Sequence, residues 1–193
     1  MKVYELKGSL RTELGKKATK ATRVGESVPC VLYGGKENVH FTATAADLRK
    51  LIYSPDVFVV NLDVDGKACK AIMKDLQFHP VSDKVLHIDF LEVFENKPVV
   101  VELPVQLTGL AEGVKAGGKL ALEMRKLRVK GLYTNFPEKI VIDVTSLGLG
   151  KSIQVGALKF ENFDILNAKN AVVTQVKLTR AARGAAAAAA SKK

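Results

Sequence analysis

Residues 9–35 have the sequence SLRTELGKKATKATRVGESVPCVLYGG, in which a polar and basic segment is followed at once by an apolar one. Between Glu13 and Arg23 no apolar residue recurs at helical or strand spacing, so this part is predicted to be a solvated loop that builds no core. The apolar run VPCVLY predicts a buried strand that ends at Gly34-Gly35. A basic loop anchored by a buried strand presents cations to phosphate groups, whereas an ordinary charged surface loop is the alternative.

Composition and charge restrict the class of protein. The chain has 193 residues, enough for one large domain or two of ordinary size, and its hydrophobic content of 47% excludes global disorder. The formal net charge of +10 indicates an anionic partner, and nucleic acid is the commonest one for a basic protein. Residues 1–36 carry eight Lys and Arg against three Glu, and the last fifteen residues carry four basic residues and no acid. The positive charge is therefore localised, which favours a localised binding site.

The two cysteines and the N-terminus indicate a compartment. Cys30 and Cys69 lie in apolar settings without CxxC spacing, so we expect free thiols in a reducing environment. The N-terminus MKVYELKG lacks the apolar core of a signal peptide, and no run reaches membrane-spanning length. We therefore expect a soluble cytoplasmic protein.

The first half of the chain is rich in strand patterns. Strands are predicted over residues 3–10, 28–33, 39–42 and 85–91, and a hairpin over residues 57–74. The hairpin turns at Asp65-Gly66, with Phe58, Val60, Leu62, Val64, Cys69, Ala71 and Met73 on its core face and Asn61, Asp63, Lys70 and Lys74 on the other. Thr44 is expected to cap a short helix with Leu48, Leu51 and Ile52 on one face, ended by Pro55.

A polar segment divides this half from the rest. ENKP at 95–98 predicts a domain boundary, so we expect a first domain over residues 1–94 and a second over 95–178. The second contains VVVELPVQLTG, KLRVKGLYTNF, KIVIDVT and AVVTQVKL, and is predicted to be mainly antiparallel β. The low-complexity residues 179–193 are expected to be a disordered, Ala-rich basic tail. The fold class is thus mainly β (α+β).

Three motifs resemble sites for ions or nucleotides but lack residues that such sites require. NLDVDG at 61–66 resembles the start of a calcium loop, but Ile72 stands where a bidentate Glu is required. Gly15-Lys16 lacks the first glycine and the Ser or Thr of a phosphate-binding loop. The histidines and cysteines have no metal-ligand spacing, so we expect neither a metal nor another cofactor.

His87 and Asp89 are neighbours on one strand face. A His–Asp pair can serve a catalytic triad, but no nucleophile motif accompanies it, so catalysis ranks last. RNA offers another use for the pair, because 2′-hydroxyls and guanine amino groups are donors that an aspartate accepts from. Tyr33, at a strand end, can stack on a sugar or base, although an ordinary core aromatic is nearly as good an interpretation.

Several segments resemble those of a known family, and they occur in the same order and at the same spacing. RTELGKKATKATR, VPCVLYGG, KDLQFHP and HIDF resemble the bacterial large-subunit ribosomal proteins that bind 5S rRNA, the twenty-fifth in the subunit's naming. VELPVQLTGLAEGVKAGG, PEKIVIDVTSLGLGKSI and GALKF resemble the second domain of the long form, also called CTC or general stress protein. The resemblance covers about residues 3–178, and the motifs are specific in combination.

The resemblance implies a six-stranded β-barrel with short helices, a second β-rich domain, and docking on the minor groove of 5S rRNA. The RNA contacts that it implies are Arg11, Lys16, Thr19, Lys20, Arg23, Tyr33, Lys74, His87 and Asp89. Thr19 stands where a serine is common, and Lys74 stands where a glutamine can contact RNA. Ala21 replaces a basic residue often found after Lys20.

We therefore predict a structural protein of the large ribosomal subunit, with no enzymatic activity. Its expected partners are 5S rRNA, the large subunit and neighbouring ribosomal proteins, with no membrane and no small-molecule substrate. The alternative is a cytosolic stress-response RNA-binding protein that acts off the ribosome. A small hydrolase using His87 and Asp89 is the interpretation from a different class.

Overall fold

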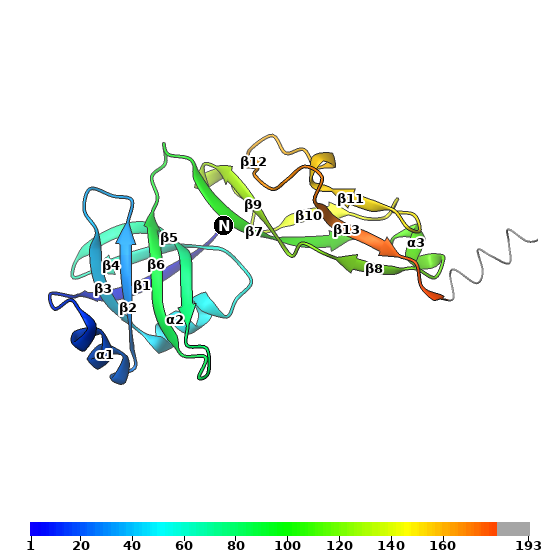
Figure 1. Cartoon of the computed structure of the whole chain (residues 1–193). Coiled ribbons are helices and arrows are strands. Elements are labelled where there is room, and N and C mark those ends of the chain that lie inside the picture. The colour runs from blue at the N-terminus through cyan, green and yellow to red at the C-terminus, as the bar shows by residue number, and fades with distance from the viewer. Residues whose placement is uncertain (181–193) are drawn as a thin grey trace, which may run out of the picture. The chain divides into compact units, whose positions relative to one another are not determined.

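The computed structural model of the chain describes residues 1–180 (Figure 1). These residues form two compact units. The first comprises Met1–Val99 together with Leu132–Phe136, and the second comprises Val100–Gly131 and the described residues from Pro137 onward. Both units consist mostly of strands, as the predicted mainly β fold class requires.

The first unit is a closed barrel of six strands, and the predicted barrel is confirmed. The strands are β1 (Lys2–Leu10), β2 (Ser27–Tyr33), β3 (Val39–Thr44), β4 (Phe58–Val64), β5 (Lys67–Phe78) and β6 (Val85–Glu92). They close in the order β1-β3-β2-β6-β5-β4. The pairs β1–β4 and β2–β6 are parallel and the other four are antiparallel. Closure leaves this sheet no free edge, which removes the usual site of strand-to-strand aggregation.

Side chains along each strand point alternately inward and outward, and the inward ones fill the barrel interior. On β6, Ile88 and Phe90 are fully buried, while His87 and Asp89 point outward and stay partly exposed, as predicted. Phe90 packs against Phe41 of β3 with ring centroids 5.7 Å apart. The buried core also contains Leu6, Val28, Cys30, Leu32, Ala43, Leu48, Leu51, Phe58, Val60, Leu62, Val64 and Ala71.

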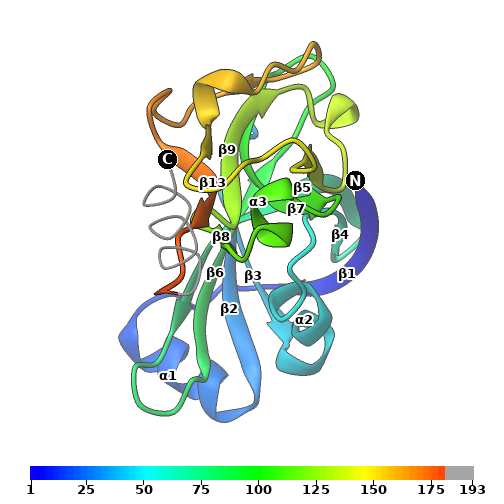
Figure 2. The ribbon, with the colours of Figure 1, turned by 90° about the vertical axis from the view of Figure 1, so that its right-hand side faces the viewer.

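Helix α2 (Ala45–Ile52) contributes to this core, and its predicted cap is confirmed. The Thr44 hydroxyl accepts a hydrogen bond from the Asp47 backbone N–H at 3.3 Å. Leu48 and Leu51 are buried in the barrel core. Both α1 and α2 lie at the same end of the barrel in the two views (Figures 1 and 2).

The predicted basic loop is wrong in conformation, because Lys16–Val24 form helix α1. Lysine and alanine have high helix propensity, which favours a helix here. The hydroxyls of Thr19 and Thr22 donate to the carbonyls of Gly15 and Ala18, so these side chains are satisfied locally. None of its residues is buried. A helix without a core face has no apolar period to detect, so the search for hydrophobic spacing missed it.

The hairpin of β4 and β5 turns at Asp65-Gly66, as predicted, with φ angles of 47° and 86°. Its outer face differs from the expected polar surface, because the cross-strand partners Val59 and Ile72 are 6% and 3% exposed. The segment Leu132–Phe136, part of this unit, lies beside that face, since Lys70 Nζ donates to the Tyr133 hydroxyl at 3.3 Å. Sequence alternation does not reveal a covering segment that arrives from much later in the chain.

The second unit contains two small sheets, ordered β10-β7-β9-β12 and β11-β13-β8. Their strands are β7 (Val99–Thr108), β8 (Lys119–Leu122), β9 (Lys126–Gly131), β10 (Ile140–Asp143), β11 (Ser152–Gln154), β12 (Asp164–Ile165) and β13 (Val172–Lys177). Helix α3 (Glu112–Lys115) and the 3-10 helices η1 (Tyr133–Asn135) and η2 (Val155–Ala157) complete the described elements. The β10–β7 pair is parallel, whereas β12–β9, β13–β8 and β11–β13 are antiparallel.

The second unit has a buried core of its own, in which Leu103, Leu127, Ile140 and Val173 are almost fully buried. Ala111, Val144, Leu147 and Val176 form a buried cluster, with Leu107, Val114, Leu120 and Ile153 packed against it. The predicted strand KLRVKGLYTNF ends at Gly131, after which the chain enters η1. Thr179 Oγ1 donates to the Gly117 carbonyl at 2.6 Å, and the predicted disordered tail falls, from residue 181, outside the described residues. Among residues 1–180, no helix is long and apolar enough to cross a membrane.

Candidate nucleic-acid interface

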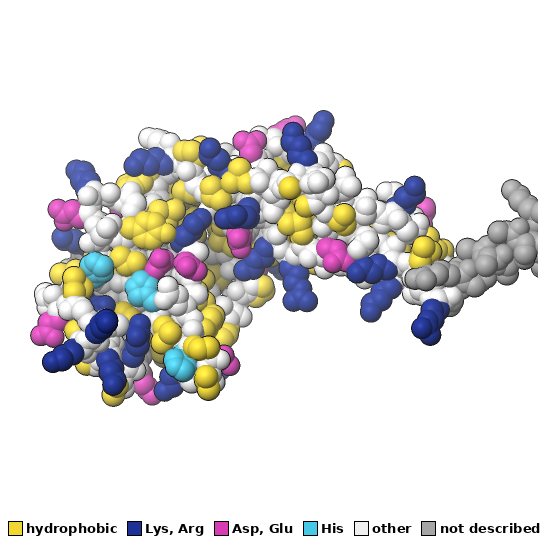
Figure 3. All heavy atoms as spheres, in the orientation of Figure 1, with side chains coloured by type: hydrophobic (Ala, Val, Ile, Leu, Met, Phe, Trp, Pro, Cys, Tyr) yellow, Lys and Arg dark blue, Asp and Glu magenta, His cyan; other side chains and the backbone are white. Residues whose placement is uncertain are grey.

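One face of α1 carries a row of polar and basic side chains. Lys16, Thr19, Lys20 and Arg23 follow the spacing i, i+3, i+4, i+7, which places them on one side of a helix. Ala18 and Thr22, on the other side, are half-buried, and α1 contacts β2. Figure 3 shows Lys and Arg side chains gathered over α1, next to histidine and acidic side chains on the same face of the barrel unit. The helix therefore turns a scattered sequence pattern into one cationic surface.

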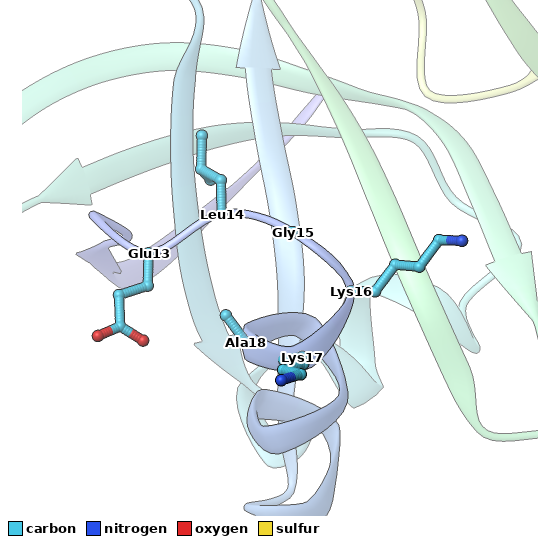
Figure 4. Close-up of a pocket in the computed structure, with 6 residues that line it drawn as sticks. All are labelled: Glu13, Leu14, Gly15, Lys16, Lys17 and Ala18. Carbon is cyan, nitrogen blue, oxygen red and sulfur yellow. The ribbon is translucent and has the colours of Figure 1, made fainter.

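The start of α1 borders an open hollow lined by Glu13, Leu14, Gly15, Lys16, Lys17 and Ala18 (Figure 4). Gly15 has a φ of 111°, a left-handed conformation that glycine adopts without strain. This bend sends the Lys16 side chain to one side of the turn and the Glu13 carboxylate to the other (Figure 4). The helix N-terminus and the two lysines together make this end of α1 electropositive.

The two arginines of the predicted site are engaged within the protein. Arg23 donates from Nε and Nη2 to the backbone carbonyl of Leu86, at 3.1 and 2.9 Å. Arg11 donates from Nη2 to the Thr19 hydroxyl at 3.2 Å and to the Glu13 carbonyl at 3.4 Å. Thr19 in turn donates to the Gly15 carbonyl at 2.8 Å, so its hydroxyl proton is already used.

An acceptor-bearing pair lies on β6, directly after the carbonyl that Arg23 contacts. His87 Nδ1 and Asp89 Oδ1 are 2.7 Å apart, and the two side chains are 28% and 31% exposed. The prediction that these two side chains are neighbours is confirmed. On the next strand, Gln77 and Asp75 of β5 are their register partners. The outer surface of β5 and β6 thus presents carboxylates, an imidazole and an amide side by side.

Tyr33, at the end of β2, shares this outer surface. Its neighbour Leu32 is buried in the core, and β2 pairs with β6 so that Val31 lies opposite Asp89 and Tyr33 opposite Leu91. The tyrosine is half-buried and points outward, so the core-aromatic alternative is wrong. Burial and then the nearby carboxylates of Asp89 and Asp75 raise the pKa of Tyr33 above its ordinary value. Its hydroxyl is therefore neutral at pH 7 and able to donate or accept.

Lys74 lies on β5 at an irregularity of the β5–β6 register, which shifts between Met73 and Asp75. Lys74 is exposed and lies next to Asp75, which pairs with Asp89. All nine predicted site residues therefore belong to the barrel unit, since each lies within Met1–Val99. Reasoning from sequence missed Gln77 and Asp75. The signal that could have found them is the register of the β5–β6 pair, which places Gln77 opposite His87 and Asp75 opposite Asp89.

The possible metal ligands and the two cysteines of the described residues have their own geometry. Among the residues that the structure describes, no three His, Cys, Asp or Glu side chains group closely enough to hold a metal ion. Cys30 and Cys69 are both free thiols, and burial raises the pKa of Cys30 to about 12. A thiol with that pKa stays protonated at pH 7 and is a poor nucleophile.

Comparison with known families gives matches over both units. A family model described as Ribosomal L25p family matches residues 6–90. A second model, described as ribosomal protein TL5, C-terminal domain, matches residues 98–180. The first match contains all nine predicted site residues, and the second covers the strands from β7 to β13.

Curated relatives match almost the whole chain. One named large ribosomal subunit protein bL25, from Azobacteroides pseudotrichonymphae, is 60% identical over 95% of this chain and 97% of its own length. A protein of the same name from Porphyromonas gingivalis is 61% identical over 96% of this chain and 98% of its own. Another from Bacteroides fragilis is 59% identical over 98% of this chain and 99% of its own.

Proposed function

Since the chain belongs to the ribosomal L25p family, we propose that it binds 5S rRNA within the large ribosomal subunit, through its barrel unit. Membership makes it a structural protein of the large subunit and not an enzyme, located on the ribosome in the cytoplasm. The 5S rRNA partner and the contact residues are the finer part of the proposal. Residues 1–94 are proposed to be sufficient for this contact.

The observation that carries the proposal is the juxtaposition of two kinds of group. The cationic face of α1 lies beside a β6 surface that offers carboxylate and imidazole acceptors, joined through the Arg23–Leu86 contact. Phosphates alone explain the lysines but would be repelled by Asp89. A double-stranded RNA minor groove presents both phosphates and donors, namely 2′-hydroxyls and guanine amino groups. This ligand satisfies both halves of the surface.

The proposed roles follow the chemistry of each side chain. Lys16 and Lys20 meet phosphates, and Lys74 adds a cation at the register irregularity of β5. Asp89 accepts from an RNA donor, while His87 orients it through the 2.7 Å contact and can itself donate or accept. Tyr33 packs on a sugar or base beside them. The proposed interface as a whole consists of Arg11, Lys16, Thr19, Lys20, Arg23, Tyr33, Lys74, His87 and Asp89.

Salt dependence tests the contact between α1 and phosphate. Changing Lys16→Ala or Lys20→Ala should weaken 5S rRNA binding at low salt and flatten the plot of log affinity against log salt by about one unit each, because one counterion fewer is released. The measurement is a titration of purified 5S rRNA at several salt concentrations, with a footprint that locates the protein. Lys50→Ala, in the exposed last turn of α2, is the matched control and should leave the slope unchanged.

Unchanged slopes in both lysine variants would contradict a phosphate contact of α1. A footprint that is absent from 5S rRNA, with the wild-type protein folded, would contradict the proposed partner itself.

A fragment of residues 1–94 tests which part of the chain binds. It retains all six barrel strands and every proposed contact residue, so its affinity for 5S rRNA should stay within about tenfold of the whole chain, or 1.4 kcal/mol. It lacks Tyr133 and Glu95, which hydrogen-bond each other and Lys70, so its thermal midpoint should be lower. A folded fragment that loses more than tenfold would show that later residues belong to the RNA site.

A further inference from the structure

A row of apolar side chains crosses the outer face of the barrel at one level. The strand register pairs Val3 of β1 with Val59 of β4, Val59 with Ile72 of β5, and Ile72 with Leu91 of β6. These four side chains point outward, since neighbours such as Ala71 lie in the buried core inside the barrel. Val59 and Ile72 are nevertheless only 6% and 3% exposed, so the middle of the row is covered from outside.

The segment Leu132–Phe136, which we call the strap, is tied to this outer face by the Tyr133 side chain. Lys70 Nζ donates to the Tyr133 hydroxyl at 3.3 Å, and that hydroxyl donates to Glu95 Oε1 at 3.3 Å. The same Nζ lies 5.8 Å from the centroid of the Tyr133 ring. Lys70 stands on β5 two residues before Ile72, so the strap is anchored beside the covered part of the row.

Burial of aromatic rings contributes more to this attachment than the polar contacts do. The side chains of Lys70 and Glu95 are 52% and 71% exposed and their charged atoms are 3.5 Å apart, so this ion pair adds little. Tyr133 and Phe136 are only 8% and 3% exposed, and a buried aromatic side chain removes about 150–250 Å² from water. The two rings therefore supply most of the free energy that holds the strap.

The chain connects both ends of the strap to one sheet of the second unit. Strand β9 ends at Gly131, directly before the strap, and β10 begins at Ile140, shortly after it. Both strands belong to the sheet ordered β10-β7-β9-β12. A tethered segment docks at a higher effective concentration than a free one, and the tether is shortest when the strands at both ends are formed. Docking of the strap is therefore strongest while the second unit is folded.

We propose that the strap is a conformational device that couples the stability of the barrel to that of the second unit. A folded second unit restrains the ends of the strap, and the docked strap in turn stabilises the β4–β5 face of the barrel. Such coupling is reciprocal, so loss of either unit weakens the other by the same free energy. This inference concerns the free protein and does not depend on binding to 5S rRNA.

The first experiment removes the strap's aromatic anchor in the full-length chain. Tyr133→Ala is expected to lower the thermal midpoint of the barrel, read from NMR signals of β4 and β5, by about 5–10 °C, because a buried ring is lost. Tyr133→Phe keeps the ring and should lower the midpoint by less than half as much. Tyr53→Ala, at a position 66% exposed, is the matched control and should shift it by no more than about 2 °C.

The second experiment weakens the second unit and follows the same barrel signals. Leu127 of β9 is fully buried, so Leu127→Ala opens a cavity in the second unit. We expect this change to lower the barrel midpoint as well, because it frees the ends of the strap. In the double variant of Leu127→Ala and Tyr133→Ala the barrel midpoint should fall no further than in the stronger single variant, since both changes remove the same coupling.

Two results would overturn the proposal. A barrel midpoint that is unchanged by Tyr133→Ala would show that the strap does not support the barrel. Shifts that add in the double variant, or a barrel that is insensitive to Leu127→Ala, would show that the strap does not carry the coupling between the two units. Equal and non-additive shifts support it.

Discussion

Changing Asp89→Asn is expected to weaken 5S rRNA binding by about tenfold or more while the barrel stays folded. The Asp89 carboxylate lies 2.7 Å from His87 Nδ1 on the outer face of β6 and carries the wrong sign for a phosphate site. If it accepts from a 2′-hydroxyl or a guanine amino group, the amide loses a charge-assisted bond worth about 1.5–3 kcal/mol and turns donors toward donors. If it only repels phosphate, the same change should leave affinity unchanged or improve it.

Salt and a matched control make this test specific. The loss should persist at high salt, because the bond is local and the number of released counterions barely changes. Asp83→Asn, in the turn before β6, removes an equal charge at a left-handed position that asparagine tolerates, and should have little effect. Tight binding by a folded Asp89→Asn protein would remove β6 from the proposed RNA surface.

Changing Phe41→Ala is expected to destabilise the barrel unit by about 3–5 kcal/mol. The ring is fully buried between β1 and β2 and packs on Phe90 at 5.7 Å between centroids. Collapse around the cavity is restricted, because the facing residue is Gly8, where a Cβ would lie only 2.6 Å from the ring. The site therefore has no side chain from that position to fill the space.

The measurement is urea unfolding of the full chain, followed through NMR signals of barrel residues so that the second unit does not contribute. Leu14→Ala, at a position 59% exposed, is the control and should stay within about 0.5 kcal/mol of the wild type. A loss below about 1 kcal/mol for Phe41→Ala would show that the β1–β3–β2 region repacks and does not depend on this ring.

Local sequence patterns were sufficient to predict much of the barrel correctly. Asp65-Gly66 predicted a tight turn because few other dipeptides accept positive φ at both positions, and the turn then determined which residues face the core. Alternation on β6 correctly placed His87 and Asp89 together and outward. Thr44 and the leucines after it predicted α2, since a cap and an apolar stripe are both readable from neighbouring residues.

The errors occur where an element has no hydrophobic period or where distant segments decide the outcome. Helix α1 has no apolar stripe, and the contact of Arg23 with Leu86 joins residues 63 positions apart. The burial of Val59 and Ile72 on the outer face of their hairpin, beside the Leu132–Phe136 segment, is likewise invisible to a pattern of period two.

The sequence by itself determined the strands, the tight turn, the excess of cations near the N-terminus and the family, because each depends on residue types at short spacing. The tertiary structure alone decided that Tyr33 points outward beside Asp89 and that Gln77 and Asp75 join the same surface. The physical reason is barrel closure. Strand register, and with it the set of side chains that share a face, depends on pairing between segments far apart in the chain, which no local propensity encodes.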